Sequence, residues 1–205
     1  MLNELAWILA AYSLGALPFS VWFGRLLLKR DIRAVGDGNP GTSNFFKAGG
    51  KRYLAWGIGV MLLEVFKSML PVLFGAWYAN LQGWSLVALA LAPVVGNAFT
   101  PFLQLRGGKS IAVILGMWGG LTFFIVPSLL GILFFVWIRL LKNDAWGMML
   151  GYVSLLLAFL ILRSAWFYYP IWLGTFLILV YKWRDGLKTL PDLRQTLFGK
   201  FLSRP

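Results

Sequence analysis

The sequence contains no cysteine and no histidine among its 205 residues. The absence of cysteine excludes disulfides, thiolate metal sites and a cysteine nucleophile. The absence of histidine removes the most frequent general base and the most frequent ligand of transition metals. Charged residues are also scarce, because they make up 13% of the chain, against about 25% in soluble domains.

Apolar residues, by contrast, make up 60% of the chain, and the mean hydropathy is +0.76. Too few polar residues remain to cover a soluble globule, so lipid must surround most of the chain. Lys and Arg together number 19, and Asp and Glu number 7, which gives a net charge of +12. This excess does not favour nucleic acid as a partner, because a basic nucleic-acid-binding domain does not carry such an apolar load.

Six apolar stretches are long enough to predict transmembrane helices, at about 20 residues for each crossing. They cover residues 5–28, 54–79, 84–103, 111–138, 146–162 and 166–181. The first lacks a preceding basic segment and is too long for the apolar part of a signal peptide, so we expect a retained span. The stretch 111–138 is interrupted by glycines and by Pro127, and it is either one tilted helix or two short limbs.

The distribution of basic residues favours two limbs. With two limbs, every loop cation except Arg163 falls on one face of the membrane, as the positive-inside rule requires. We therefore expect an all-α integral membrane fold of about seven transmembrane helices, of which the two middle ones are short or broken. The N-terminus is expected outside, and residues 1–205 form a single polytopic domain. Residues 181–205 are expected as a cytoplasmic tail with a short helix on the membrane surface.

The first cytoplasmic loop, residues 29–52, has the composition of a phosphate site. Its glycines permit backbone conformations that gather N–H groups into one concavity, and its basic side chains would neutralise a phosphate. The alternative is a solvated basic loop with glycines in its turns. The residues with these properties include the glycines Gly36, Gly38 and Gly41, the neutral donors Asn39, Thr42, Ser43 and Asn44, and the cations Arg33, Lys47, Lys51 and Arg52.

A second glycine-rich segment, residues 95–110, lies at another helix junction. Arg106, Gly107, Gly108 and Lys109 precede an apolar helix, so we expect the two glycines to expose backbone donors beside a positive helix N-terminus. The GGKS sequence is not a nucleotide-binding P-loop, because the required first glycine is missing and no strand precedes it. ATP hydrolysis is therefore not predicted.

The apolar stretches also contain polar residues. Glu64 and Lys67 lie three residues apart on one helical face, and unpaired charges at that depth would be costly. We expect them to pair with each other or to line a polar cavity. Ser154, in the fifth stretch, could add a hydroxyl group to the cytoplasmic half of the bundle, although a serine there more often serves helix packing.

These segments resemble the bacterial acyl-phosphate-dependent glycerol-3-phosphate acyltransferases, a family of integral membrane enzymes. The likeness covers nearly the whole chain. It includes LPFS at residues 17–20 and DIRAVGDGNPGTSN at residues 31–44, which is similar to a family pattern DIRxxGSGNxGaTN. It also includes Glu64 and Lys67, as an acidic-x-x-Lys pair, and residues 95–110, which are similar to VGHxfpvFLxFKGGKG.

The resemblance implies that an acyl group moves from an acyl phosphate to glycerol 3-phosphate, at an active site that faces the cytoplasm, with membrane lipid as the surroundings. It implies no cofactor and no metal. The implied catalytic residues are Lys109, Asn39 and Lys47. The implied substrate-binding residues fall into a pocket on the first loop, a pocket on the second loop, the cavity between them and the C-terminal tail. They are Asp37, Gly38, Thr42, Ser43, Asn44, Glu64, Lys67, Asn97, Arg106, Gly107, Gly108, Ser154 and Arg184.

Several positions differ from the family patterns. Asp37 replaces a serine, and we expect its carboxylate to repel phosphate unless it is protonated or paired with Arg33 or Lys47. Lys47 replaces an arginine, Asn97 a histidine and Ser110 a glycine; near the C-terminus, Trp183 and Gly186 replace a histidine and an asparagine. Two alternatives therefore stay open: an acyltransferase with a different acceptor, and a non-catalytic relative that binds a phosphorylated lipid or another anion.

Overall fold

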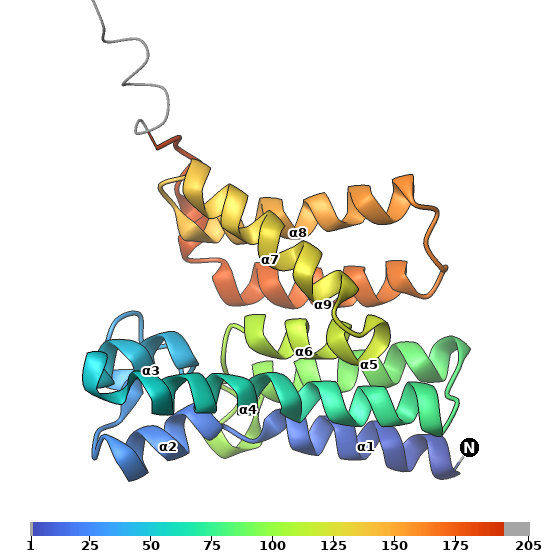
Figure 1. The fold of residues 1–205 in the computed structure, drawn as a ribbon, viewed down its shortest axis with the longest axis horizontal. Coiled ribbons are helices and arrows are strands. Elements are labelled where there is room, and N and C mark those ends of the chain that lie inside the picture. Colours follow the sequence, from blue (N-terminus) through green and yellow to red (C-terminus); the bar gives the residue numbers. More distant parts are fainter. Residues whose placement is uncertain (1, 195–205) are drawn as a thin grey trace, which may run out of the picture. The chain divides into compact units, whose positions relative to one another are not determined.

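The computed structural model describes residues 2–194 (Figure 1). Within them, all regular secondary structure is helical apart from one isolated bridge between Leu141 and Leu193. This confirms the all-α prediction. The chain forms two compact units, of which the first ends at Pro127 and the second begins at Ser128.

The first unit contains most of the helices. In chain order they are α1 (Leu2–Ala16), α2 (Phe19–Leu27), the 3-10 turn η1 (Ile32–Ala34), α3 (Thr42–Gly49), the 3-10 turn η2 (Lys51–Tyr53), α4 (Leu54–Leu73), the π-helical turn η3 (Phe74–Tyr78), α5 (Gly83–Ala98), the 3-10 turn η4 (Pro101–Leu103) and α6 (Ile111–Thr122). α7 (Ile125–Leu140) begins at the end of this unit and lies mostly in the second.

The first apolar stretch, expected as one span over residues 5–28, is one candidate membrane span over Leu2–Leu27 that consists of two helices. α1 ends at Ala16 and α2 begins at Phe19, with Pro18 between them. A proline has no backbone N–H and disfavours helical geometry in the residue before it, so the helix breaks there. The break leaves the Leu17 carbonyl free for a partner outside its own helix.

The interrupted stretch 111–138 is two helices, as the charge distribution predicts. α6 has 12 residues and ends before Phe123, whose φ of 53° is incompatible with a right-handed helix. At 1.5 Å per residue α6 is about 18 Å long, shorter than the roughly 30 Å of a bilayer core. Among residues 2–194, four helical segments are long and apolar enough to span a membrane, and α6 and α7 are shorter apolar helices.

Close helix packing in the first unit depends on small residues. A Cβ on Gly96 of α5 would lie 2.3 Å from the Tyr12 carbonyl oxygen of α1, and one on Gly116 of α6 would lie 2.1 Å from the Val65 carbonyl oxygen of α4. Backbones approach this closely in membranes where glycine replaces larger residues. Beneath the first loop, a buried apolar cluster packs α2, η1, α3, α4 and η4 together; it consists of Val21, Ile32, Phe45, Val60 and Leu103.

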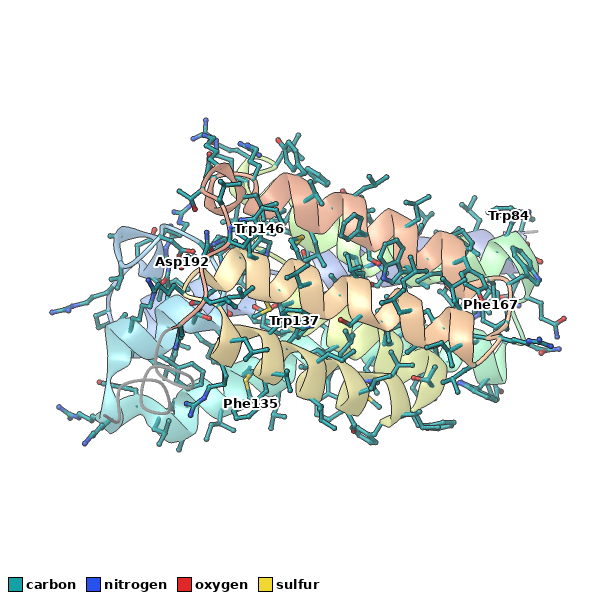
Figure 2. The ribbon with its side chains drawn as sticks, turned by 90° about the horizontal axis from the view of Figure 1, so that it is seen from above. Trp84, Phe135, Trp137, Trp146, Phe167 and Asp192 are labelled. Atoms are coloured by element: carbon teal, nitrogen blue, oxygen red, sulfur yellow. The ribbon has the colours of Figure 1, made fainter. Side chains whose placement is uncertain are left out.

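The second unit contains the rest of α7, α8 (Asp144–Ile161), α9 (Tyr168–Trp183) and the 3-10 turn η5 (Gly186–Lys188). The buried rings of Tyr152 and Trp172 stack with centroids 5.8 Å apart, and the Trp172 indole donates to the Tyr152 carbonyl oxygen. Figure 2 shows Trp146 near one end of α8 and Phe167 beyond the other end. Aromatic residues at both ends of an apolar helix are typical of a membrane span.

The tail differs from the expected surface helix as far as the structure describes it. Between η5 and Arg194 the chain forms no helix: Lys142 donates from its backbone N–H to the Asp192 carbonyl oxygen at 2.9 Å, and the Arg194 backbone N–H donates to the Leu140 carbonyl oxygen at 2.8 Å. These bonds hold the segment against the connection between α7 and α8. The remaining part of the predicted tail, residues 195–205, lies outside the described residues.

Candidate functional site

The two glycine-rich loops meet in the first unit. The Lys109 ammonium lies 2.7 Å from an oxygen of the Asp37 carboxylate, and the Lys109 backbone N–H donates to Asn39 Oδ1 at 3.0 Å. About seventy residues of chain separate these partners. The sequence predicts two phosphate pockets, and the structure joins the loops that form them into one polar cluster.

Asp37 is therefore paired. Its partner is Lys109, whereas the sequence indicates Arg33 or Lys47 as candidates. Arg33 instead forms an ion pair with Asp31 at 2.6 Å. Partial burial of the Asp37 carboxyl would raise its pKa, but the Lys109 ammonium and the donors of the first loop outweigh this and hold the pKa below its ordinary value. At neutral pH the carboxylate is ionised and neutralises Lys109.

The first loop is held together by side-chain amides. The Asp37 carboxylate accepts from the Asn39 backbone N–H at 3.2 Å and from Asn44 Nδ2 at 3.0 Å, and Asn44 Nδ2 also donates to the Asn39 carbonyl oxygen at 2.9 Å. Gly36 and Gly38 have φ of 64° and 72°, which glycine adopts without strain. These contacts fix the position from which the Asp37 carboxylate reaches Lys109.

Asn44 is fully buried, and its Oδ1 has no hydrogen-bond partner among residues 2–194. A Cβ on Gly36 would lie 2.5 Å from this oxygen and 3.0 Å from the Lys47 ammonium. Gly36 therefore makes room for both groups, and Lys47 belongs to the same cluster. A buried, unpartnered carbonyl oxygen is costly in an empty site and is a natural acceptor for a ligand hydroxyl group.

Thr42 and Ser43 lie in the first turn of α3, which no side chain caps. The N–H groups of a first helical turn have no partner within the helix and favour an anion. Asn39 Nδ2 lies against the residue before this turn, because a Cβ on Gly41 would be 2.7 Å from it. The neutral donors predicted in the first loop are thus gathered at one helix start.

The second loop does not expose the backbone donors that we expected. The Gly107 N–H donates to the Ala98 carbonyl oxygen at 3.1 Å, and the Gly108 N–H donates to the Asn97 carbonyl oxygen at 3.2 Å. A Cβ on Gly107 would lie 1.9 Å from that Asn97 oxygen. The glycines are needed because the loop folds back against the end of α5.

Glu64 and Lys67 form the predicted pair, with a Glu64 oxygen 2.6 Å from the Lys67 ammonium and both side chains buried. The ammonium also donates to the Leu17 carbonyl oxygen at 2.7 Å and to Asn97 Oδ1 at 2.9 Å. Each of these three partners is an oxygen from a different part of the first unit. The pair connects the break between α1 and α2 to the end of α5.

The network continues into α2 and into the second loop, and it includes residues that composition alone does not single out. Glu64 accepts from the Ser20 backbone N–H at 2.9 Å and from the Ser20 hydroxyl at 2.8 Å. Asn97 Nδ2 donates at 2.8 Å to the hydroxyl of Ser110, the residue before α6. A polar residue two positions after a proline within an apolar stretch is the signal that points to Ser20.

Arg106 is separated from Lys109, although we expected both in one pocket. It lines a cavity together with Arg25 and Arg33, whereas Lys109 contacts Asp37. Consecutive left-handed conformations at Gln104 and Leu105, with φ of 54° and 62°, turn the chain before Arg106. The loop thus carries two cationic side chains with different surroundings.

Ser154 and Arg184 belong to the second unit. The Ser154 hydroxyl accepts from the indole of Trp137 at 3.0 Å, with Trp137 labelled in Figure 2, and donates to the Leu150 carbonyl oxygen of its own helix at 2.8 Å. Its contacts are those of a helix-packing serine. The Arg184 guanidinium lies over the Tyr181 ring at 4.5 Å and donates to the Tyr181 carbonyl oxygen.

Gly186, one of the two C-terminal positions that differ from the family pattern, has a structural role here. The Gly186 carbonyl oxygen accepts at 2.6 Å from Asn143, whose side chain caps α8. A Cβ on Gly186 would lie 2.7 Å from the Cβ of Ala145. Glycine therefore lets this turn pack against the start of α8, where an asparagine would not fit.

The fold and this cluster define the class of protein: an all-helical integral membrane protein with lysine, asparagine and glycine gathered at a candidate phosphate site. The chain belongs to the glycerol-3-phosphate acyltransferase family, whose model matches residues 5–192.

Individual relatives agree with this assignment. A glycerol-3-phosphate acyltransferase of Enterococcus faecalis is 40% identical over 129 residues, which are 60% of this chain and 56% of the relative. In that alignment the chain spans little more than half of the relative's length. Glycerol-3-phosphate acyltransferase 1 of Thermotoga maritima is 32% identical over 177 residues, which are 77% of this chain and 83% of the relative.

Solved structures show the same fold. The crystal structure of PlsY, an integral membrane glycerol 3-phosphate acyltransferase, in its glycerol 3-phosphate form has a TM-score of 0.77 at 23% identity and covers 98% of this chain and 100% of that chain. Its lysophosphatidic acid form has a TM-score of 0.78 at 22% identity, over 97% of this chain and 93% of that chain.

Proposed function

We propose that the protein transfers an acyl group from an acyl phosphate to glycerol 3-phosphate and releases lysophosphatidic acid and inorganic phosphate. The observation that carries the proposal is the contact between the two loops, which places Lys109, Asn39 and Lys47 in one cluster. Both substrates carry a phosphate, and a site for them needs cations and neutral donors side by side.

In the proposed reaction the acceptor hydroxyl oxygen forms an ester bond to the acyl carbon, and the bond from that carbon to the phosphate oxygen breaks. The leaving phosphate takes the hydroxyl proton. The reaction therefore needs no general base from the protein, which contains no histidine. The acyl phosphate is already activated, and the protein contributes positioning and charge neutralisation. Lys109 neutralises the phosphate that leaves, while Lys47 and the start of α3 hold the other.

The other members of the cluster have supporting roles in this proposal. The Asp37 carboxylate pairs with Lys109 until a substrate phosphate replaces it. The unpartnered Oδ1 of Asn44 accepts a hydrogen bond from a substrate hydroxyl group. The Glu64 and Lys67 pair positions the second loop through Asn97. Gly38, Thr42, Ser43, Gly107 and Gly108 give the loops their shape and donors. The proposal uses residues of the first unit and needs neither Ser154 nor Arg184.

We propose that these residues face the cytoplasm in a single seven-span domain of the cell membrane, with the N-terminus outside. The helices support this count if α1 and α2 form one span and α4 to α9 form one each. Arg163 is then the sole loop cation outside among the described residues, and the positive-inside rule is satisfied. A cysteine introduced at Lys51 should be labelled by an impermeant thiol reagent only after the membrane is opened.

The activity is tested with detergent-purified protein, palmitoyl phosphate and glycerol 3-phosphate, by measuring released phosphate and lysophosphatidic acid. We expect release that depends on the acceptor and falls by at least a hundredfold in Lys109→Ala. The matched control is Lys142→Ala, which removes an exposed lysine paired with Asp192. Full activity in Lys109→Ala, or equal loss in both variants, would contradict the assignment of this site.

The Asp37 and Lys109 ion pair also favours a second candidate, a non-catalytic relative that binds a phosphorylated lipid. Asp37 neutralises the cation that the reaction requires, at the position where family members resembling this chain have a serine. The same assay separates the candidates. Folded wild-type protein that binds lipid but releases no phosphate, with or without acceptor, would support the second.

A further inference from the structure

A cavity of about 370 Å³ lies in the first unit at the end of α2 and beside η4. Neither Asp37, Asn39 nor Lys109 lines it, so it is distinct from the cluster proposed for the reaction. Its wall combines cationic, amide and aromatic side chains, namely Trp22, Arg25, Arg33, Phe102, Gln104 and Arg106.

The cavity carries an excess of positive charge. Asp31 pairs with two of its three guanidinium groups, at 3.0 Å to Arg25 and 2.6 Å to Arg33. Arg106 forms no ion pair with any residue between 2 and 194. One carboxylate against three guanidinium groups leaves a net charge of about +2, and guanidinium groups favour two-point contact with phosphate oxygens.

One side of the cavity is apolar. The rings of Trp22 and Phe102 meet edge to face with centroids 5.7 Å apart, although the two residues are 41% and 56% exposed. Exposed aromatic rings beside arginines are typical of the level at which lipid headgroups meet acyl chains. A free phosphate ion would leave this apolar wall without a contact.

The wall is held in place before any ligand binds. The Thr100 hydroxyl donates to the Ala16 carbonyl oxygen at 2.6 Å and accepts from the Phe102 backbone N–H at 3.3 Å. The Leu105 N–H donates to the Thr100 carbonyl oxygen at 2.9 Å, and the Arg106 N–H to the Leu103 carbonyl oxygen at 2.9 Å. A preorganised site loses less conformational entropy when it binds.

We propose that this cavity binds the phosphate headgroup of an anionic membrane lipid, with Arg25, Arg33 and Arg106 around the phosphate and with Trp22 and Phe102 against the start of the acyl chains. The site goes beyond the proposed reaction, because the lipid bound here is neither acylated nor cleaved. Because Arg106 lies in the same loop as Lys109, lipid binding here would make that loop sensitive to the lipid composition of the membrane.

The test is lipid retention by the full-length protein in detergent, measured by native mass spectrometry with dioleoyl phosphatidic acid and, separately, dioleoyl phosphatidylcholine. We expect wild-type protein to prefer phosphatidic acid, and Arg25→Gln to weaken that binding about tenfold through loss of one charge-assisted contact. Asp31 keeps its contacts with the backbone N–H and the guanidinium group of Arg33, so the loop is retained. The control, Arg30→Gln, removes an exposed neighbouring charge outside the cavity and should bind as the wild type does.

Two further variants distinguish this cavity from the loop cluster and from general charge attraction. Trp22→Ala should weaken lipid binding without a change of charge, and Lys109→Ala should leave it intact, which separates this site from the proposed active site whatever the activity of the protein. Equal losses in Arg25→Gln and Arg30→Gln would overturn the proposal in favour of diffuse attraction. Loss of lipid in Lys109→Ala, or displacement of the lipid by equimolar inorganic phosphate, would overturn it as well.

Discussion

Asp37 pairs with Lys109, the cation proposed to meet a substrate phosphate, and its replacement tests that proposal most directly. Asp37→Asn removes the charge but keeps an oxygen that accepts from the Asn39 N–H and from the Asn44 amide, as Asp37 does now. We expect this variant to have a lower KM for the phosphate-bearing substrates. Asp37→Ser should act in the same direction, because a serine hydroxyl also accepts from the loop backbone.

The magnitude follows from the geometry. A phosphate on Lys109 would lie about 5 Å from the Asp37 carboxylate, and the side chain of Asp37 is 46% exposed, so the dielectric constant is close to that of water. Repulsion of a phosphate dianion at that distance costs about 1–2 kcal/mol. The exposed ion pair itself contributes about 0–1 kcal/mol. Together these values predict a KM lower by about tenfold.

The assay is steady-state phosphate release over a range of glycerol 3-phosphate and, separately, palmitoyl phosphate concentrations. Asp192→Asn is the matched control, because it removes an exposed carboxylate from another lysine pair. A tenfold or larger fall in kcat with Asp37→Asn, in folded protein, would refute the reasoning. Asp37 would then take part in the reaction and would not compete with phosphate for Lys109.

Three further predictions concern stability. Lys67→Met should destabilise the protein by about 3–5 kcal/mol because it leaves the buried Glu64 carboxylate without an ion-pair partner. The double variant with Glu64→Gln should have a higher melting temperature than Lys67→Met alone. Gly107→Ala should prevent accumulation of folded protein, because the added Cβ would lie 1.9 Å from a carbonyl oxygen. The control is Gly59→Ala, whose Cβ would meet open space and which should be neutral or slightly stabilising. Size-exclusion chromatography compares the two variants. Arg33 and Arg25 hold the pKa of Asp31 well below its ordinary value of 3.8, despite the opposing effect of burial; its contribution to stability is therefore present above that pH and lost as the pH falls below it. A melting temperature recorded from pH 8 to pH 3 should show this acid loss in the wild type and less of it in Asp31→Asn.

The helical class and the membrane environment follow from the sequence alone. Hydropathy acts through every residue of a stretch, so the positions of the apolar helices depend little on what packs against them. The division of residues 111–138 into α6 and α7 also follows, because the loop charges on either side indicate it. The break at Pro18 does not follow from hydropathy, which predicts one continuous span, although the chemistry of proline contains the signal.

The pairing of Glu64 with Lys67 was predictable for a local reason. Three residues of helix bring the two side chains together wherever the helix lies, and the apolar surroundings make pairing the favourable outcome. Their further partners lie outside α4: Leu17 at the break between α1 and α2, Ser20 in α2 and Asn97 in α5. Those contacts depend on how α1, α4 and α5 pack.

The partner of Asp37 could not be inferred in the same way. Within the loop Arg33 is the nearest cation in sequence, yet Arg33 binds Asp31 and the carboxylate of Asp37 reaches Lys109. Helix packing in the first unit brings the second loop to the first, and no local pattern encodes that distance.

Sequence therefore determined which residue types the site contains, because motifs of glycine, asparagine and lysine are local and chemically specific. Tertiary structure decided what each of them does. In the folded protein the N–H groups of Gly107 and Gly108 bond to the end of α5, Lys109 pairs with Asp37, and Arg106 lines a separate cavity. The physical reason is that hydrogen bonds and ion pairs act over a few ångströms, and only the packed helices set which groups come within that range.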